Sequence, residues 1–229
     1  MARPPEEYAW IRFNPRQLSA KVLSRGAGTD ALISVCSDLA AYDLLSSYPA
    51  GATYKGNPVQ GSNGTVSYSE GPGGPLVLTA TPLPSKRNLA LADLVRVPVW
   101  NKDKGAVGYE GPRPPSSEFW LHEELYADLP VTWIAHVHAP VADLFAPAAR
   151  RLWRDLGVRE TGTYAEDGTL AVPESVKMVL DDPLQDYVVL TGHGTPWDPA
   201  HTGAVVMDTD PERLVARIRT IHDSLRAAV

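Results

Sequence analysis

The sequence has little or nothing of several features that would define a class of protein. Cys36 is the only cysteine, so no disulfide can form within the chain. There is no block of lysine or arginine, and the formal net charge is −6, which argues against nucleic acid as the main partner. No apolar run approaches the length of a membrane span, and the N-terminal residues lack an apolar signal core. We therefore expect a cytoplasmic protein with no membrane or nucleic-acid partner.

Some common signatures of catalysis are absent as well. Neither glycine-rich phosphate motif, GxxxxGK[ST] or GxGxxG, occurs, so the sequence does not support use of a nucleotide. There is no GxSxG nucleophile elbow, and Cys36 lies in an apolar segment where a buried thiol is expected. Any catalytic chemistry must therefore come from other residues.

The overall composition is that of a globular protein. Hydrophobic residues make up 44% and charged residues 21% of the 229 positions, enough for a substantial core in one large domain. Residues 1–15 are rich in proline, and we expect an irregular N-terminal arm over 1–28 followed by a single domain over 29–229. Short strands mixed with helices, without strict β-α-β alternation, predict an α/β or α+β layered domain with a substantially antiparallel sheet.

Apolar periodicity locates most of the elements. Helical spacing predicts helices over residues 29–48, 117–127, 140–156 and 172–180, and β-type runs predict strands over residues 65–68, 76–81, 94–99, 131–139 and 187–190. A C-terminal helix should begin after Asp210, which can cap it, with Pro211 at its first position. Of the histidines in predicted helices, we expect His122 to be packed or capping and His222 to be exposed.

Two histidines separated by one residue, His136 and His138, belong to a predicted buried strand. Their side chains share one face, with Cβ atoms about 6.6 Å apart, and such imidazoles can converge on one zinc ion. His193 ends a second apolar run and has a glycine on each side. Three histidines at strand ends, with one coordination position open, would form a catalytic zinc site. The alternative is ordinary histidines whose ring nitrogens bond backbone carbonyls.

Glu118 follows Pro-Pro-Ser-Ser at the start of a predicted helix. Free amides and serine hydroxyls at a helix N-terminus hold anions well, so this segment could bind a phosphate or carboxylate while Glu118 acts as a base. The alternative is a plain helix start, with Ser117 as N-cap and Glu118 as a solvated acid. Residues 60–67, QGSNGTVS, form a loop whose amides could also hold an anion, although such loops are usually just turns.

Taken in order along the chain, these segments resemble the class II aldolase/adducin family over roughly residues 30–207. The resemblance is carried by the loop 60–67, the segment 78–97, the Pro-Ser-Ser-Glu sequence 115–118, the His-Val-His sequence 136–138 and the Gly-His-Gly sequence 192–194. It implies an α/β fold, a three-layer α/β/α sandwich with a mainly antiparallel central sheet. It also implies one divalent metal ion per chain, zinc, at His136, His138 and His193, with Glu118 as the catalytic acid/base.

The function implied by the resemblance is that of a zinc-dependent lyase in carbohydrate metabolism. Such an enzyme performs aldol or retro-aldol cleavage of a small hydroxy-carbonyl molecule, sugar-like and with or without a phosphate, through a metal-stabilised enediolate. The resemblance further implies a homotetramer, substrate contacts from Gly64, Thr65, Ser116 and Ser117, and Tyr164 as a candidate proton donor from a neighbouring chain. Epimerase, dehydratase or decarboxylase chemistry on the same scaffold stays open, as does a non-catalytic interaction domain like that of adducin.

Two segments depart from the family pattern. The usual Gly-Asn-x-Ser appears as Gly64-Thr65-Val66-Ser67, which removes an amide side chain that commonly helps to hold phosphate. The usual Thr-Pro-x-Gly turn is replaced over residues 81–87, which lack the glycine and add bulk and the positive charges of Lys86 and Arg87. We therefore expect a substrate other than a standard short-chain ketose 1-phosphate. An insertion-like loop over residues 195–201 could reshape the pocket.

Overall fold

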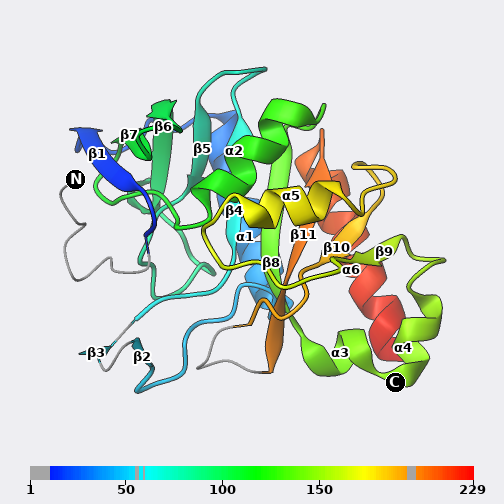
Figure 1. Ribbon diagram of the computed structural model, residues 1–229. Helices are drawn as coiled ribbons and strands as arrows, with labels where there is room; N and C mark the ends of the chain where they lie inside the picture. The colour runs from blue at the N-terminus through cyan, green and yellow to red at the C-terminus, as the bar shows by residue number, and fades with distance from the viewer. Residues whose placement is uncertain (1–10, 55–56, 59, 195–199) are drawn as a thin grey trace.

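A nine-stranded sheet dominates the computed structural model of the chain (Figure 1), which describes residues 11–54, 57–58, 60–194 and 200–229. The strand order is β1-β7-β6-β5-β4-β8-β11-β10-β9. The strands of this sheet are β1 (Asn14–Ser19), β4 (Thr65–Ser69), β5 (Leu76–Thr79), β6 (Leu94–Asn101), β7 (Ala106–Glu110), β8 (Trp133–Pro140), β9 (Val158–Glu160), β10 (Tyr187–Val189) and β11 (His201–Asp208). A separate hairpin pairs β2 (Thr53–Tyr54) with β3 (Asn57–Pro58).

The sheet is mixed but mainly antiparallel, as the family resemblance implied. The pairs β1–β7 and β9–β10 are parallel, at the two ends of the strand order, and the pairs between β7 and β10 are antiparallel. Parallel neighbours need a long crossover connection, and β9 reaches β10 through a segment that contains α5 (Ala171–Lys177). Such distant pairings leave no local signal in the sequence.

The N-terminal segment over residues 1–28 was expected to be irregular, but part of it forms a strand. Residues 14–19 form β1 beside β7, and Ile11 and Phe13 are buried. The strand was missed because its sequence, NPRQLS, is polar and half-exposed, as an edge strand can be. Residues 1–10 lie outside the described residues.

Helices begin and end for identifiable reasons. The helices besides α5 are α1 (Ala27–Ala41), α2 (Phe119–Asp128), α3 (Val141–Phe145), α4 (Pro147–Leu152), α6 (Pro211–Ala227) and the short 3-10 helix η2 (Leu91–Asp93). The helix predicted over 29–48 ends at Ala41, and Asp43 then adopts a φ of 62°. The helix predicted over 140–156 is broken at Ala146, because a residue before proline disfavours the helical conformation.

None of the described helices is long and apolar enough to cross a membrane.

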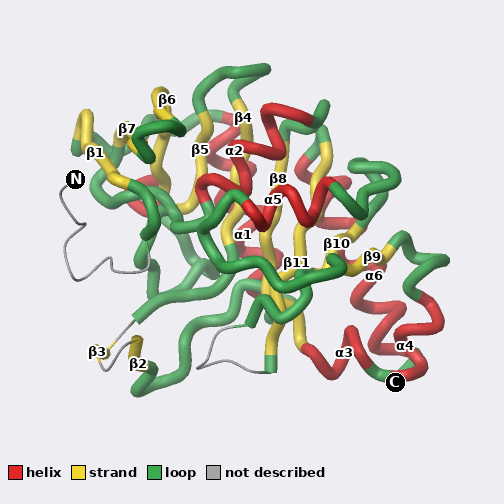
Figure 2. Tube along the Cα trace, viewed as in Figure 1, coloured by secondary structure: helices red, strands yellow, loops and turns green. Residues whose placement is uncertain are grey.

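Strand β8 lies near the middle of the sheet, and its alternate residues belong to different buried clusters. Ala135 and Val137 pack in a cluster with residues of α1 and α6, whereas Ile134 packs with residues of α2 and α5. In Figure 1, α2 and α5 cross in front of the sheet and α1 and α6 lie behind it. Figure 2 shows α3 and α4 beside α6 at one end of the molecule. His136 and His138 have the parity of Ile134 and therefore face the α2 and α5 side.

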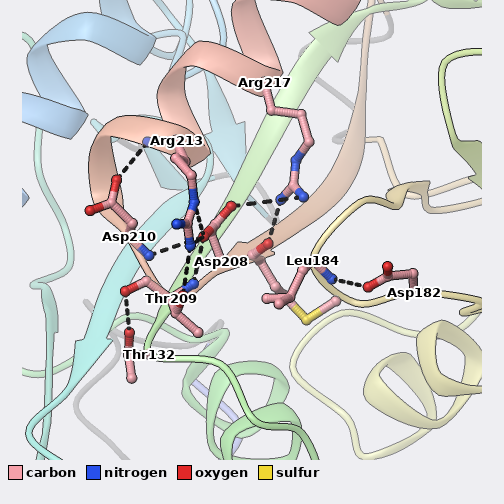
Figure 3. Close-up of polar contacts among 9 residues, drawn as sticks. Thr132, Asp182, Leu184, Asp208, Thr209, Asp210, Arg213 and Arg217 are labelled. Atoms are coloured by element: carbon pink, nitrogen blue, oxygen red, sulfur yellow. Dashed lines mark hydrogen bonds and ion pairs between the residues drawn. The ribbon is translucent and has the colours of Figure 1, made fainter.

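A buried aspartate fixes the turn from β11 into α6 (Figure 3). Asp210 accepts a hydrogen bond from the Arg213 amide at 2.8 Å, so it caps α6 as predicted, and Pro211 occupies the first helical position. Asp208, buried at the end of β11, accepts hydrogen bonds from the Asp210 amide at 3.0 Å and from Nη2 of Arg213 at 2.7 Å. The carboxylate thereby ties the last residue of the strand to the first turn of the helix.

His222 is buried, so the expectation that it would be exposed was wrong. Its Nε2 lies 2.9 Å from the Tyr187 hydroxyl, and its side chain has no exposed surface. His222 is four residues beyond Ile218 and therefore shares the buried face of α6. His122 is packed, as expected, with Nδ1 2.6 Å from the Ser67 hydroxyl.

The buried His222 predicts a loss of stability in acid. Burial lowers its pKa to about 4, whereas an unperturbed histidine has a pKa of about 6.5. Between these values the unfolded chain binds more protons, so stability is full above about pH 6.5 and falls by about 1.4 kcal/mol per unit toward pH 4. Urea unfolding at pH 7 and pH 4.5 should show a smaller loss for His222→Gln, which keeps an acceptor for Tyr187 but does not titrate. Equal losses in the two proteins would contradict this role.

Candidate metal centre and active site

Three histidines meet at the sheet. His136 and His138 come from β8, and His193 comes from the turn after β10. One nitrogen from each ring lies within 4.8 Å of the other two, and all three residues are buried. The ring centroids are 4.9 to 5.6 Å apart. The segments predicted to carry a shared site are therefore brought together, in a group that could hold a metal ion.

Glycine in the neighbouring strand makes room for these rings. Gly203 of β11 lies directly opposite His138 in the strand register. A Cβ atom at this position would be 2.3 Å from Cδ2 of His193 and 2.9 Å from Cε1 of His136, which is closer than real contacts allow. The absence of a side chain at residue 203 is thus required by the histidine cluster.

The electrostatics favour neutral rings at His136 and His138, whereas at His193 the lowering by burial is outweighed by Asp167 and Glu118, which raise its pKa. Burial, and then the neighbouring imidazoles, lower the pKa of His136 and of His138 well below the usual range. His136 Nδ1 lies 3.2 Å from the Ala204 carbonyl oxygen, which leaves Nε2 as its free nitrogen. His138 Nδ1 is buried and makes no hydrogen bond to any of the described residues. Neutral imidazoles with an unpaired buried nitrogen fit a divalent metal of the zinc type.

Glu118 is buried beside this cluster, not solvated. It occupies the N-cap position of α2, where Ser117 had been considered, and is 7% exposed. The Gly168 amide donates a hydrogen bond to its carboxylate, and Oε2 is buried with no partner in the described part of the chain. Burial raises the pKa of Glu118, with the charge of His193 opposing the shift. A buried carboxylate with one free oxygen and a raised pKa is suited to exchange a proton.

The four residues expected to contact substrate adjoin the histidines or Glu118. Thr65 lies opposite His136 in the pairing of β4 with β8, and its hydroxyl is 2.5 Å from that of Ser116. Gly64 has a φ of 76°, and a Cβ there would lie 2.5 Å from the His136 carbonyl oxygen. Ser116 and the partly exposed Ser117 directly precede Glu118. The structure therefore gathers all four around one place.

Lys86 and Arg87, which replace the usual glycine turn, are engaged elsewhere. The Lys86 ammonium is buried and donates to the Ser62 carbonyl and hydroxyl at 2.8 Å each and to the Asn63 carbonyl at 3.2 Å. Burial lowers its pKa to about 8. Arg87 donates to the Ala40 carbonyl at 3.3 Å. Lys86 thus uses all three protons to hold the loop that precedes Gly64.

Tyr164 lies next to the histidine cluster of its own chain. Its side chain is 60% exposed, and a Cβ at Gly192 would be 3.3 Å from its Cδ2, so the ring packs beside the residue that precedes His193. The loop predicted over 195–201 falls mostly outside the described residues, which omit 195–199. His201 begins β11, so it does not belong to the loop that was predicted over residues 195–201.

Residues near the site that the sequence did not reveal include Asp167 and Arg12. Asp167 Oδ1 lies 3.0 Å from Nδ1 of His193, and Arg12 pairs with Glu166 at 2.5 Å. Arg12 lies between the buried Ile11 and Phe13, Asp167 follows Glu166, and neither has a spacing that relates it to a histidine. Gly203 lacked a signal for the same reason, since its role depends on the pairing of two strands.

Known proteins share the sequence pattern and the fold of this chain, in which a mixed sheet carries three buried histidines beside a buried glutamate. The chain matches the family of the Class II Aldolase and Adducin N-terminal domain over residues 51–229, and it belongs to that family. The resemblance noted in the sequence is therefore confirmed. No curated protein matches the sequence significantly.

Solved structures share the fold across most of the chain. An L-fuculose 1-phosphate aldolase is 19% identical, with 91% of this chain and 89% of that one covered and a TM-score of 0.58. The L-fuculose-1-phosphate aldolase from Thermus thermophilus is 21% identical, with 87% and 91% covered and a TM-score of 0.53. A sugar-phosphate aldolase from Thermotoga maritima is 14% identical, with 89% and 95% covered and a TM-score of 0.60. At these identities the likeness is one of fold.

Proposed function

We propose that this protein is a zinc-dependent lyase that makes or breaks a carbon–carbon bond in a small hydroxy-carbonyl substrate. The observation that carries the proposal is the buried Glu118 beside three buried histidines whose nitrogens lie within 4.8 Å of one another. Membership in the class II aldolase family supports aldolase-type chemistry. Retention of all four residues speaks against a non-catalytic domain of the adducin kind.

In this proposal His136, His138 and His193 hold the metal, and Glu118 moves the proton. A divalent metal in such a site stabilises negative charge that develops on a substrate oxygen. The free Oε2 of Glu118 accepts the substrate proton, while the Gly168 amide holds the other side of the carboxylate. Because the raised pKa of Glu118 makes it a stronger base than a solvated carboxylate, it can both take and return the proton.

Gly64, Thr65, Ser116 and Ser117 are the proposed substrate contacts. The Thr65 and Ser116 hydroxyls are 2.5 Å apart, so the bond between them uses one of their two protons and leaves one free to donate to a ligand. Thr65 also offers a shorter reach than the asparagine usual in the family. This arrangement supports a clamp with fewer donors for a phosphate.

The three-layer α/β/α arrangement also belongs to this proposal. The alternation of β8 residues between a cluster with α1 and α6 and a cluster with α2 and α5 supports it. In this arrangement the histidines lie between the sheet and the α2 and α5 layer.

A substrate screen tests the function. Retro-aldol cleavage should be measured for ketose and hydroxy-aldehyde compounds, each with and without a phosphate. We expect kcat/KM below about 10⁴ M⁻¹s⁻¹ for short-chain ketose 1-phosphates, because each lost charge-assisted hydrogen bond weakens binding by roughly one to two powers of ten. An unphosphorylated or carboxylated compound should exceed that value.

Metal-stripped protein is the control in the screen, because any cleavage that survives removal of the metal comes from another enzyme. Ketose 1-phosphates cleaved at or above about 10⁴ M⁻¹s⁻¹, the ordinary range for a native substrate, would overturn the substrate prediction. Absence of metal-dependent cleavage for the whole panel would count against the lyase itself.

A further inference from the structure

The loop over residues 161–170, between β9 and α5, touches both halves of the proposed active site through two consecutive residues. Asp167 approaches His193, and the amide of Gly168 donates to Glu118. The loop therefore joins a residue of the histidine cluster to the proposed base. His193 follows β10 and Glu118 caps α2, so the loop lies outside the elements that position these two residues.

The contact between Asp167 and His193 involves two buried atoms. Oδ1 of Asp167 lies 3.0 Å from Nδ1 of His193. Neither atom meets hydrogen-bond geometry with any of the described residues, this contact included, although the Asp167 side chain as a whole is 46% exposed. Leaving both buried polar atoms without a bond would be costly, and at 3.0 Å a small rotation of the ring or the carboxylate places a proton between them.

The loop is anchored at several points, which holds Asp167 in place. The Thr191 amide donates to the Thr161 hydroxyl at 2.8 Å, and Arg12 pairs with Glu166 at 2.5 Å. Gly168 adopts a φ of 70°, and a Cβ there would lie 3.3 Å from the Ser117 carbonyl oxygen. The loop thus packs against the segment that precedes Glu118 and against the N-terminal residues.

The three histidines differ in what their Nδ1 atoms face. His136 faces a backbone carbonyl, His138 has no hydrogen-bond partner for this atom in the described part of the chain, and His193 faces a carboxylate. A carboxylate that accepts a proton from one ring nitrogen fixes the tautomer, orients the ring and makes the other nitrogen a stronger donor to a metal. Among these three, His193 has the only charged outer partner among the residues described.

We propose that Asp167 is a positioning residue of the metal centre, whose carboxylate accepts a hydrogen bond from Nδ1 of His193 and directs Nε2 toward the metal. The inference rests on the proposed metal site and adds to it a residue outside the ligand set. The amide of the adjacent Gly168 donates a hydrogen bond to Glu118. The same loop therefore fixes the position of the base relative to the metal ligand His193.

Metal affinity tests this role without any assay of turnover. Apo protein is titrated with Zn²⁺ in competition with a chromophoric chelator, for the wild type, Asp167→Ala and Asp167→Asn. Loss of an outer-sphere partner is expected to weaken metal affinity by roughly 10–100-fold in Asp167→Ala. Asp167→Asn should lose less, because its amide oxygen still accepts the hydrogen bond. The absorption spectrum of the Co²⁺ form should change in Asp167→Ala as His193 reorients.

Glu166→Gln is the matched control, since it removes the same charge from the neighbouring residue, keeps an amide oxygen that can accept the hydrogen bond from Arg12, and does not approach His193. Its Zn²⁺ affinity should stay within about twofold of wild type, well below the loss expected for an outer-sphere partner. Equal affinity in wild type and Asp167→Ala, or an equal loss in Glu166→Gln, would overturn the inference while leaving the metal site intact. A wild type that binds no Zn²⁺ would instead refute the proposed function. Melting temperatures of the apo proteins identify any variant that has lost its fold.

Discussion

Glu118→Gln is expected to lower turnover by about 10²-fold or more while the metal content stays at the wild-type level. Glutamine keeps the size of the side chain and can still accept the hydrogen bond from the Gly168 amide, but it cannot take a proton. The carboxylate is buried, has a free oxygen and has a raised pKa, so the loss should fall on the chemical step. Steady-state kinetics on the substrate found by screening, together with metal analysis of the same preparation, measure both quantities.

Glu123→Gln provides the control on the same helix. Glu123 is also buried, but its Oε1 accepts a hydrogen bond from the Trp100 indole and its Oε2 lies 3.6 Å from the Lys102 ammonium. Glutamine preserves that acceptor, so turnover should be unchanged. If Glu118→Gln retained near-normal turnover, Glu118 would be a structural residue at the start of α2.

The features that the sequence predicted depend on residues close together in the chain. Two histidines with one residue between them on a strand must share a face, so the pairing of His136 with His138 follows from local geometry. The cap by Asp210 depends on the residue three positions later, and it was confirmed. The break between α3 and α4 was also within reach, because Pro147 disfavours a helical conformation at Ala146.

The features that escaped prediction depend on contacts between distant segments. Strands β1 and β7 pair although they are far apart in the sequence, and neither has a strong apolar alternation. Gly203 matters because β11 lies against β8, and Asp167 matters because its loop returns to β10. His222 was misplaced because its polarity outweighed its spacing from Ile218. A single sequence contains the residues of the site but not the pairings that bring these supporting groups to it.

His136→Ala is expected to abolish stoichiometric metal binding, with affinity weakened by more than ~100-fold, the upper end of the loss for an outer-sphere partner. Removing one of three ligands leaves two imidazoles, and the described residues offer no fourth group within the cluster to replace it. Alanine is smaller than histidine, and the neighbouring Gly203 has no side chain, so the substitution creates no steric clash that could cause the loss of metal.

Metal analysis after dialysis against a weak chelator measures this loss directly. His222→Gln is the matched control, because it also removes a buried histidine but on α6, where the side chain bonds Tyr187. It should keep about one metal ion per chain, the same stoichiometry as expected for the wild type. If His136→Ala retained its metal and its activity while His222→Gln did the same, the three histidines would be ordinary buried residues and the metal site would lie elsewhere.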